Sequence, residues 1–370
     1  MTARPVRVLL AINTLARGGA ERQLVELATG LDRERFSVTV LCVVSGGPLA
    51  DELTSAGIHV AIFDSRNPVE LLRLIAHVRR QAPDIMHSFL FGSNIVGTLA
   101  ATIARTPVVI TSRRSLGFFK DRRPHYDLLQ SLANRFTDIV IANSEAVRED
   151  TLRREHLAAE KVRTIYNGVA LGAVARDSDR TRATLLGEAD RDGPLAVVVA
   201  NLIPYKGLDY FVDAWRQVLR RLPVARAVVV GEGPARAALE ARAADLSGSI
   251  RFVGSRGDVP ELLRATDVVV QSSLSEGFPN AILEAMAAGR PVVATAVGGT
   301  VEAVEHEHTG ILVPPRDSAA LAAAIVRILT HPEFARTYGL AGRKRVESQF
   351  AVARMLGRYA DLYMSTLSSR

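Results

Sequence analysis

Residues 6–31 read V-R-V-L-L-A-I-N-T-L-A-R-G-G-A-E-R-Q-L-V-E-L-A-T-G-L, and they are the best guide to the architecture of this chain. The Val- and Leu-rich run Val6–Ile12 predicts a buried strand, and the amphipathic segment Ala20–Leu31 predicts a helix. Gly18 and Gly19 lie between them, where the missing Cβ allows a tight turn. A buried strand that leads through glycines into a helix indicates a parallel α/β sheet.

The same alternation continues in two series along the chain. The strands expected in the first series are Val6–Ile12, Ser37–Val44, Ile58–Phe63, Asp84–Ser88, Pro107–Thr111, Asp138–Ala142 and Val162–Tyr166. The alternation of strands and helices then stops over a polar stretch that contains no buried strand. The strands expected in the second series are Leu195–Ala200, Ala227–Val230, Ile250–Val253, Asp267–Gln271, Pro291–Ala294 and Gly310–Val313.

We therefore predict two doubly wound, Rossmann-like α/β domains that face each other across a cleft. The first domain is expected over residues 1–168, an interdomain connection with one surface helix over 169–193, and the second domain over 194–349. Residues 350–370 predict a C-terminal helix that has no strand after it and packs back on the first domain. Sheets of this type bind ligands at the carboxyl ends of their strands, so we expect a ligand in the cleft.

Composition narrows the class of protein. Hydrophobic residues make up 48% of the 370 residues and charged residues 23%, which excludes a disordered chain. The single cysteine, Cys42, excludes an internal disulfide and a cysteine-based metal cluster, and its apolar surroundings predict a buried core position. No apolar stretch approaches the roughly 18 residues that span a membrane, and the first apolar run is too short for a signal peptide. We expect a cytoplasmic protein.

The formal net charge of +7 is unevenly distributed. The first 185 residues hold 25 Lys and Arg against 19 Asp and Glu, whereas the remainder holds 21 against 20. Five of the N-terminal cations fall within R-R-S-L-G-F-F-K-D-R-R, Arg113–Arg123, beside two phenylalanines. This stretch suits a phosphorylated lipid or an anionic membrane surface, and the alternative is a solvated loop above packed phenylalanines. Arg113 and Arg114, nearest the strand end, are the candidates to face the cleft on the acceptor side.

The string S-E-G-F-P-N-A-I-L-E-A-M, Ser275–Met286, carries the densest chemical signal. Pro279 predicts the first turn of a helix, with Glu276 in the preceding loop and Glu284 inside the helix. The N–H groups of the first turn, around Asn280 to Ile282, suit a phosphate or a sugar hydroxyl. Two carboxylates at different depths along one helix could each bind a pair of hydroxyls. The alternative makes Glu276 a helix-start acid and Glu284 a solvated residue.

This string resembles the E-x7-E signature of family four of the retaining glycosyltransferases with the GT-B fold, the glycosyl transferases group 1. The resemblance covers nearly the whole chain. The other matching stretches are Gly18–Glu21, Ile165–Val169, Asn201–Gly207, Val230–Pro234, Asp258–Leu263, Pro291–Gly299 and Gly310–Pro315.

The resemblance implies a hexosyl transfer from a nucleotide-diphosphate sugar, a UDP- or GDP-sugar, to a hydroxyl acceptor with the anomeric configuration retained. It implies that Glu284 binds the ribose, that Glu276 holds sugar hydroxyls near the reacting centre, and that Lys206 contacts the diphosphate. A fixed cation there would stabilise the charge that develops on the leaving group. The further donor contacts implied are Gly18, Gly19, Asn201, Ser255, Arg256, Gly277, Phe278, Asn280, Ala281 and Ile282.

The resemblance also implies partners and a location. The acceptor is expected to be a glycan or a lipid-linked glycan in bacterial polysaccharide or glycolipid synthesis, bound mainly by the first domain. We expect no obligatory cofactor, no metal, since no Asp-x-Asp string is present, and no nucleic-acid partner. The protein would then be cytoplasmic and peripheral on the inner face of the cell membrane.

Two positions depart from the family pattern. Asn201 stands where many members carry an arginine, so one cation of the usual diphosphate clamp is absent. Members often show H-x-H after the fourth strand, but here Phe89 occupies the later position and only His87 remains. His87 is therefore a candidate catalytic residue, with a partly buried strand-end histidine as the alternative.

Two other function classes were weighed. A catalytically inactive nucleotide-sugar-binding or scaffold protein of the same fold would account for Asn201 and Phe89. A nicotinamide-dependent oxidoreductase would need G-x-G-x-x-G after a strand, but the sequence after Gly231 and Gly233 has Arg236 in place of the third glycine.

Overall fold

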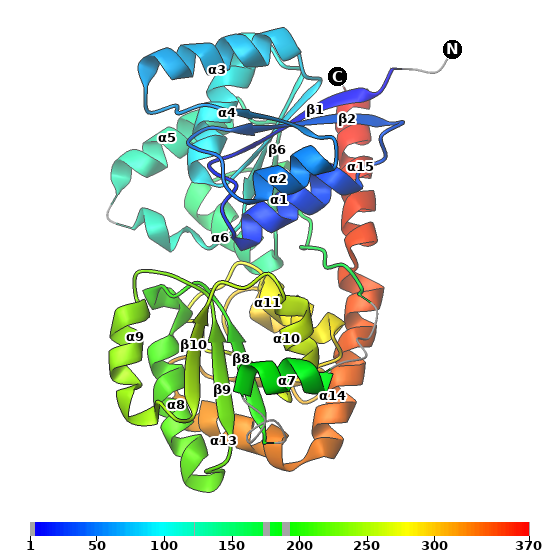
Figure 1. Ribbon diagram of the computed structural model, residues 1–370. Coiled ribbons are helices and arrows are strands. Elements are labelled where there is room, and N and C mark those ends of the chain that lie inside the picture. The colour runs from blue at the N-terminus through cyan, green and yellow to red at the C-terminus, as the bar shows by residue number, and fades with distance from the viewer. Residues whose placement is uncertain (1–3, 122, 173–177, 187–192, 370) are drawn as a thin grey trace. The chain divides into compact units, whose positions relative to one another are not determined.

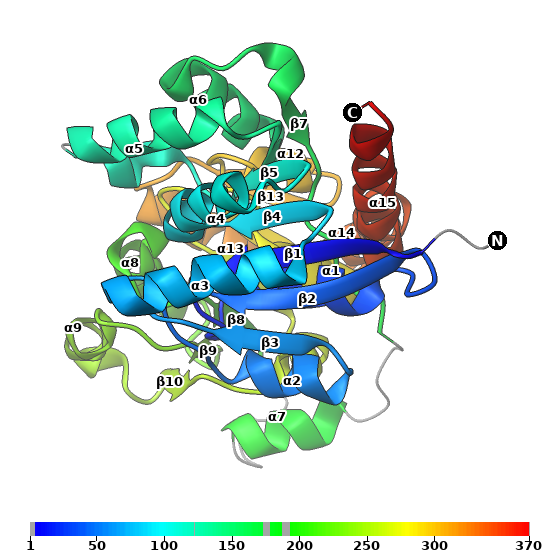
Figure 2. The same cartoon turned by 90° about the horizontal axis from the view of Figure 1, so that it is seen from above.

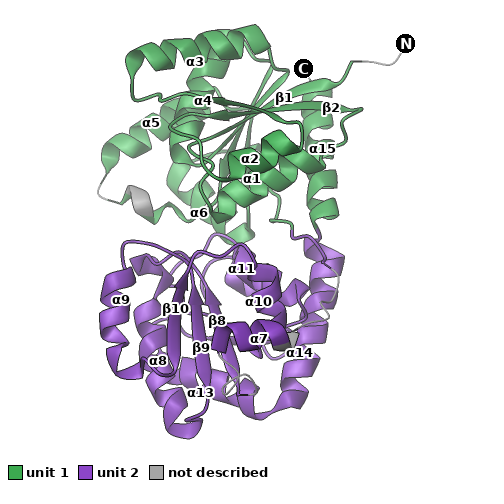
Figure 3. Cartoon of the chain, in the orientation of Figure 1, with its two compact units in different colours: residues 1–168, 352–370 green, residues 169–351 purple. Residues whose placement is uncertain are grey.

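The computed structural model describes residues 4–121, 123–172, 178–186 and 193–369 (Figure 1). The chain forms two compact units. Unit 1 comprises residues 1–168 and 352–370, and unit 2 comprises residues 169–351 (Figure 3). The prediction of two parallel-sheet α/β domains is confirmed.

The sheet of unit 1 has seven strands, all parallel, in the order β3-β2-β1-β4-β5-β6-β7. Figure 2 shows β3, β2, β1, β4 and β5 side by side in this order. The strands are β1 (Val6–Ile12), β2 (Phe36–Cys42), β3 (His59–Ile62), β4 (Ile85–Phe89), β5 (Val108–Arg113), β6 (Ile139–Ala142) and β7 (Val162–Thr164).

Helices cover both faces of this sheet. They are α1 (Gly19–Gly30), α2 (Leu49–Ser55), α3 (Pro68–Gln81), α4 (Phe91–Ala104), α5 (Pro124–Arg135), α6 (Glu145–Glu155) and α15 (Val352–Ser368), with short helices η1 (Gly117–Lys120) and η2 (Ala159–Lys161). Alternate side chains of β1 point to opposite faces. Leu10 lies in the core cluster formed with α1, α2 and α15, and Leu9 lies in the cluster formed with α3 and α4. Cys42 is fully buried in the first cluster, and burial raises the pKa of its thiol to about 12.

Helix α15 completes unit 1 from the far end of the sequence. Its residues Met355, Tyr359 and Tyr363 are buried in the same core cluster as β1 and α1. The hydroxyl of Tyr363 lies 2.6 Å from Nδ1 of His87 on β4, whose Nε2 lies 2.8 Å from Oγ of Ser112 on β5. His87 therefore links α15 to the middle of the sheet through a buried polar chain.

The sheet of unit 2 has six parallel strands in the order β10-β9-β8-β11-β12-β13. These are β8 (Leu195–Val199), β9 (Arg226–Val230), β10 (Ile250–Gly254), β11 (Val268–Gln271), β12 (Val292–Thr295) and β13 (Gly310–Val313). The helices are α7 (Ser178–Leu186), α8 (Leu208–Arg221), α9 (Arg236–Arg242), α10 (Val259–Ala265), α11 (Asn280–Ala287), α12 (Thr300–Ala303), α13 (Ser318–Thr330) and α14 (Pro332–Arg345), with η3 (Pro204–Lys206), η4 (Ala244–Leu246) and η5 (Val346–Phe350). Phe211 and Trp215 of α8 are buried in its core.

Part of the expected connection over 169–193 lies outside the described residues. Within it, the structure describes residues 169–172, helix α7 and residue 193. Of the helices in the described part of the chain, none combines the length and the apolar character that crossing a bilayer requires.

The burial of His87 predicts acid sensitivity of unit 1. Burial holds the pKa of His87 well below its usual value, so an unfolded chain binds a proton near pH 6.5 that the folded chain does not. The stabilisation that neutral His87 contributes should be present above pH 6.5 and fall by about 1.4 kcal/mol per pH unit below it. Calorimetry between pH 7.5 and 5 should show a shallower pH dependence of the unfolding temperature for His87→Gln than for the wild type. The matched control is His308→Gln, since the His308 side chain is 69% exposed. Parallel curves for wild type and His87→Gln would contradict this prediction.

Candidate functional site

Lys206 and Glu276 meet at the point where the strand order of unit 2 reverses. β8 and β11 are neighbours at this point, because the chain runs outward from β8 to β9 and β10 and from β11 to β12 and β13. Lys206 lies in the loop after β8, and Glu276 lies in the loop after β11. Parallel sheets bind ligands at this position, where the loops at the carboxyl edge diverge.

Three donors converge on one oxygen of Glu276. Oε1 accepts hydrogen bonds from Nζ of Lys206 at 2.6 Å, Nε2 of Gln271 at 2.9 Å and Oγ of Ser273 at 2.5 Å. The Glu276 side chain is 7% exposed and that of Lys206 is 18% exposed. Nζ of Lys206 also lies 5.6 Å from the centre of the Tyr205 ring. The carboxylate is thus fixed in place, and it holds the ammonium group beside it.

The two loops that carry this pair are tied to each other. The N–H of Leu274 donates to the carbonyl of Tyr205 at 2.8 Å, and Oγ of Ser272 donates to the carbonyl of Lys206. The end of β12, from which a third loop continues, joins them, because Oγ1 of Thr295 donates to the carbonyl of Ser273 at 2.5 Å.

Gly298, in that third loop, approaches Glu276 so closely that no side chain fits. A Cβ at Gly298 would lie 1.9 Å from the carbonyl oxygen of Glu276, and the residue has φ +48°. Glycine is therefore required at this position to keep the backbone of Glu276 where the three donors reach it.

Helix α11 begins directly after these residues. Pro279 is its N-cap, and the first intrahelical hydrogen bond runs from the N–H of Leu283 to the carbonyl of Pro279. The N–H groups of Asn280, Ala281 and Ile282 therefore point out of the helix start. The side chain of Ile282 is fully buried, so Ile282 can offer a ligand only its backbone.

The other residues of this string differ in exposure. Gly277 is buried, and the side chain of Phe278 is buried against the ring of Phe350, with a 5.3 Å distance between ring centroids. Glu284 is half-buried within α11. Glu284 and the start of α11 thus belong to the same edge of unit 2 as Lys206 and Glu276.

The remaining donor candidates of unit 2 lie in loops at the same edge. Asn201, after β8, is exposed, and Ser255, after β10, is exposed as well. Arg256 pairs with Asp258, with Nη2 2.7 Å from the carboxylate, which raises the pKa of Arg256. Arg256 is thus already neutralised locally.

In unit 1, Gly18 is the N-cap of α1 and Gly19 is its first residue. The carboxylate of Glu21 folds over this helix start, since a Cβ at Gly18 would lie 2.2 Å from its Oε2. Burial raises the pKa of Glu21, and the nearby charge of Arg114 opposes this shift. A phosphate bound at this helix start would have to displace or share the position of that carboxylate.

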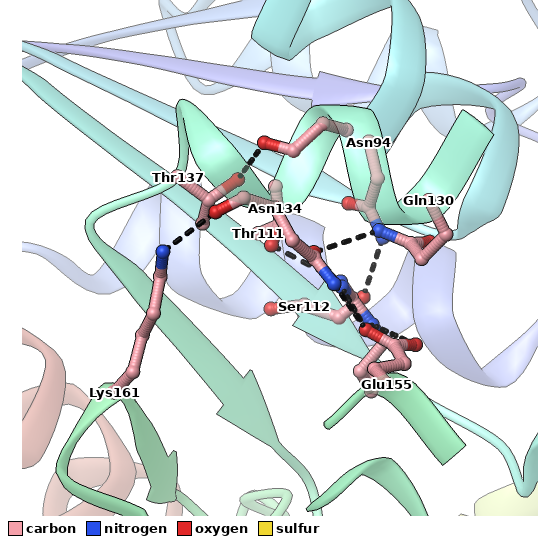
Figure 4. A network of polar contacts seen from close by, with 10 residues as sticks. Asn94, Thr111, Ser112, Gln130, Asn134, Thr137, Glu155 and Lys161 are labelled. Atoms are coloured by element: carbon pink, nitrogen blue, oxygen red, sulfur yellow. Dashed lines mark hydrogen bonds and ion pairs between the residues drawn. The ribbon is translucent and has the colours of Figure 1, made fainter. Parts of the chain in front are cut away.

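Arg113 and Arg114 belong to the interior of unit 1. Arg113 lies 2.8 Å from Glu155, with the side chains 8% and 5% exposed, and donates to Asn134 at 2.9 Å. Asn134 in turn donates to Glu155 (Figure 4). Arg114 donates to Oδ1 of Asn167 and lies over the Phe89 ring. Arg122 and the side chains of Phe119 and Lys120 lie outside the described residues.

His87 is not at the edge of its sheet. It is fully buried, with one ring nitrogen beside Tyr363 and the other beside Ser112. This geometry favours a structural histidine over the catalytic one, and His87 is fully buried inside β4 rather than partly buried at its end. We therefore leave His87 out of the site proposed below.

Sequence reasoning missed the groups that orient Glu276. Gln271 and Ser273 gave only a weak signal, namely polar residues at the end of a buried strand and just after it. It also missed the buried amides of unit 1, Asn94 and Gln130, which interrupt otherwise apolar or exposed helical segments. Among the residues that the structure describes, no three His, Cys, Asp or Glu side chains are grouped to hold a metal ion.

Two family models match this chain. The model described as Glycosyltransferase Family 4 matches residues 17–172, nearly all of them in unit 1, and the model described as Glycosyl transferases group 1 matches residues 193–331, within unit 2.

Two curated relatives match over most of their length. The UDP-Gal:alpha-D-GlcNAc-diphosphoundecaprenol alpha-1,3-galactosyltransferase of Escherichia coli is 26% identical over 95% of this chain and 95% of its own. The putative glycosyltransferase EpsD of Bacillus subtilis is 29% identical over 85% of each chain. Among solved structures, Anabaena HepE in complex with UDP-glucose is 26% identical with a TM-score of 0.86, over 98% of this chain and 100% of that one.

The close approach at Gly298 yields a matched pair of variants. Gly289 also has a positive φ, +70°, but nothing lies within 4 Å of where its Cβ would be. Gly289→Ala should cost about 1–2 kcal/mol in the free energy of unfolding, from its backbone conformation alone. Gly298→Ala should cost at least about 2 kcal/mol more because it overpacks the Glu276 loop. Urea titrations of both variants measure this difference, and equal losses would contradict the constraint.

Proposed function

The chain belongs to the family-four glycosyltransferases of the GT-B fold, and from this we propose that it transfers a sugar from a UDP-sugar to a hydroxyl acceptor with retention of the anomeric configuration. The observation that carries the proposal is the Lys206–Glu276 pair at the strand-order reversal of unit 2. The solved relative that binds UDP-glucose favours a uridine nucleotide over guanosine.

In this proposal the two partners of the pair have separate roles. Lys206 Nζ donates one of its three N–H groups to Glu276 and can donate the other two to the diphosphate. Glu276 uses Oε1 to hold its three donors, and we assign its Oε2 to hydroxyls of the donor sugar. Glu284 binds the ribose, and the N–H groups at the start of α11 bind the phosphates or the sugar.

The hydrogen bonding of Glu276 supports retention of the anomeric configuration. An inverting transfer needs a general base that takes the acceptor proton. In this proposal Glu276 has no oxygen for that role, because Oε1 accepts three hydrogen bonds and Oε2 is assigned to the donor sugar. We propose instead a displacement on one face. The bond from the anomeric carbon to the diphosphate oxygen breaks, the acceptor oxygen bonds to the same face, and its proton passes to the leaving diphosphate. Lys206 stabilises the charge that develops there.

The catalytically inactive alternative rests on Asn201, which supplies no charge at the diphosphate. Lys206 still provides one fixed cation, and the described loops hold it in position, so we favour the active enzyme. Binding of UDP without release of UDP from any UDP-sugar would favour the alternative.

Removing either member of the pair tests the function. Lys206→Ala and Glu276→Gln should each lower turnover by roughly 10²–10³, the scale expected for one preorganised electrostatic group. UDP release from UDP-glucose and UDP-galactose measures turnover, and NMR of the transferred sugar gives its anomeric configuration. Lys344→Ala is the matched control, because Lys344 is an exposed lysine of the same unit. Near-wild-type turnover in both variants, or an inverted product, would overturn the mechanism.

We further propose a glycan or lipid-linked glycan as acceptor, in bacterial polysaccharide or glycolipid synthesis. The support is the Escherichia coli relative, whose name describes transfer to a sugar on diphosphoundecaprenol. A lipid-linked acceptor would be reached from a position at the membrane surface.

We also propose peripheral membrane association. Arg113 and Arg114 are not part of the proposed membrane surface, because their side chains point into unit 1. Helix α5 instead buries its amides Gln130 and Asn134 and exposes its leucines. Six of the fifteen large apolar side chains exposed on the described residues lie on α4 and α5 or directly after α5. These six form what we call the α4–α5 face: Leu99, Ile103, Leu128, Leu129, Leu132 and Phe136.

The charges around the α4–α5 face fit an anionic bilayer. Helix α4 contains no Lys, Arg, Asp or Glu, and the exposed charged residues nearest to these apolar side chains in sequence are Arg105, Arg123, Arg135 and Asp127. Apolar side chains could enter the interface while the arginines attract acidic headgroups, each for about 1 kcal/mol.

Vesicle binding tests this surface. Leu128→Gln with Leu132→Gln should weaken binding to vesicles of phosphatidylcholine containing about a third phosphatidylglycerol at least tenfold, since two leucines no longer enter the interface. The matched control is Val224→Gln with Leu340→Gln, which removes two comparably exposed apolar side chains from unit 2. Equal loss in both double variants, or a loss of self-association instead of vesicle binding, would overturn the proposal.

A further inference from the structure

A pocket of about 240 Å³ opens at the carboxyl edge of the sheet of unit 1. Its wall includes Asn13, directly after β1, and Leu90 and Phe91, directly after β4. β1 and β4 are the neighbours at which the strand order of this sheet reverses, so the pocket occupies the position where doubly wound sheets bind ligands. Its volume lies just below the range of pockets for drug-sized ligands, which suits a group of about one sugar ring.

Two buried amides that line this pocket have carbonyl oxygens without a hydrogen-bond partner. Asn94 and Gln130 both line it, and each is 1% exposed. Oδ1 of Asn94 and Oε1 of Gln130 have no hydrogen-bond partner. A buried carbonyl without a partner is energetically unfavourable, so two of them on residues that line one pocket point to a ligand that supplies the missing donors.

The orientation of each amide is fixed by the groups behind it. Nδ2 of Asn94 donates to the carbonyl of Ser112 at 2.9 Å, which turns its oxygen away from that strand. Oδ1 of Asn134 accepts from Arg113, and Nδ2 of Asn134 donates to Glu155. The same Oδ1 of Asn134 also accepts from Nε2 of Gln130 at 3.0 Å, so the amide nitrogen of Gln130 faces Asn134. Figure 4 shows these amides around Ser112 and Glu155.

Two of the three arginines that line the pocket are paired with carboxylates, and the third lies near the charge of Glu21 outside the lining. Arg113 pairs with Glu155, and Arg154 pairs with both Asp150 and Asp121. Arg114, the remaining cation of the described lining, contacts Asn167 and the Phe89 ring and interacts with the charge of Glu21. The pocket thus offers acceptor oxygens without a surplus of positive charge, unlike a phosphate site.

We infer that this pocket binds an uncharged sugar of the acceptor, whose hydroxyl or amide N–H groups donate to Asn94 and Gln130. The inference rests on the proposed function and specifies the chemistry that it leaves open on the acceptor side. It differs from the sequence prediction, in which Arg113 and Arg114 bind an anionic group there. A phosphate on the acceptor would have to lie outside this pocket.

A titration of the full chain, saturated with UDP, tests the inference. The probes are methyl N-acetyl-α-D-glucosaminide, methyl α-D-glucoside and N-acetylglucosamine 1-phosphate, followed by ligand-observed NMR. We expect at least one neutral glycoside to bind and the phosphorylated sugar to bind at least tenfold more weakly, because it brings an uncompensated charge. Gln130→Met and Asn94→Leu should each weaken the neutral glycoside about tenfold, the scale of one hydrogen bond.

Stability measured on the same variants separates binding from structure. Each substitution removes an unpaired buried carbonyl and also the hydrogen bond that the amide nitrogen donates to Ser112 or Asn134. We therefore expect unfolding temperatures close to that of the wild type, with Gln217→Met in unit 2 as the control. Variants that unfold earlier but keep glycoside affinity would overturn the inference, and so would tighter binding of the phosphorylated sugar. If the wild type releases UDP from UDP-glucose but binds no glycoside, the inference is overturned while the proposed function stands. Failure to bind UDP would count against the proposed function instead.

Discussion

Parallel pairing governs both units, because a parallel sheet gathers the ends of all its strands at one edge. In unit 2 this places the loops after β8, β11 and β12 together, and they fix the backbone of Lys206 and Glu276 through main-chain and hydroxyl contacts. In unit 1 it places Asn13 beside the start of α4, where Oδ1 of Asn13 accepts from the N–H of Ser93. An antiparallel sheet would divide these loops between two edges.

Internal ion pairs determine which cations remain available for ligands. Arg113, Arg154 and Arg256 are all held by carboxylates within their own units. Lys206 also has a carboxylate partner, but a lysine that gives one N–H to Glu276 keeps two more to direct elsewhere. A planar guanidinium held by two bonds to one carboxylate, as at Arg256, has less to offer.

The sequence predicted the architecture well because its signals are local. Apolar runs such as Val6–Ile12 are continuous in sequence, and the structure places strands on nearly the same residues. The site was predicted less completely, because Gln271 and Ser273 matter only through where Glu276 lies. His87 shows the limit most clearly. Its neighbour Tyr363 is 276 positions away, so no local pattern could show that α15 covers it.

Unit 1 also constrains the order in which the chain can fold during synthesis. Its core includes Met355, Tyr359 and Tyr363, which are made only after the whole of unit 2. At 5–20 residues per second, the ribosome needs roughly ten to forty seconds to synthesise residues 169–351. During that interval the face of the sheet that α15 covers has no α15. At its end unit 2 has every residue of its own core, while unit 1 still waits for α15. The domain that begins first is therefore the one that finishes last.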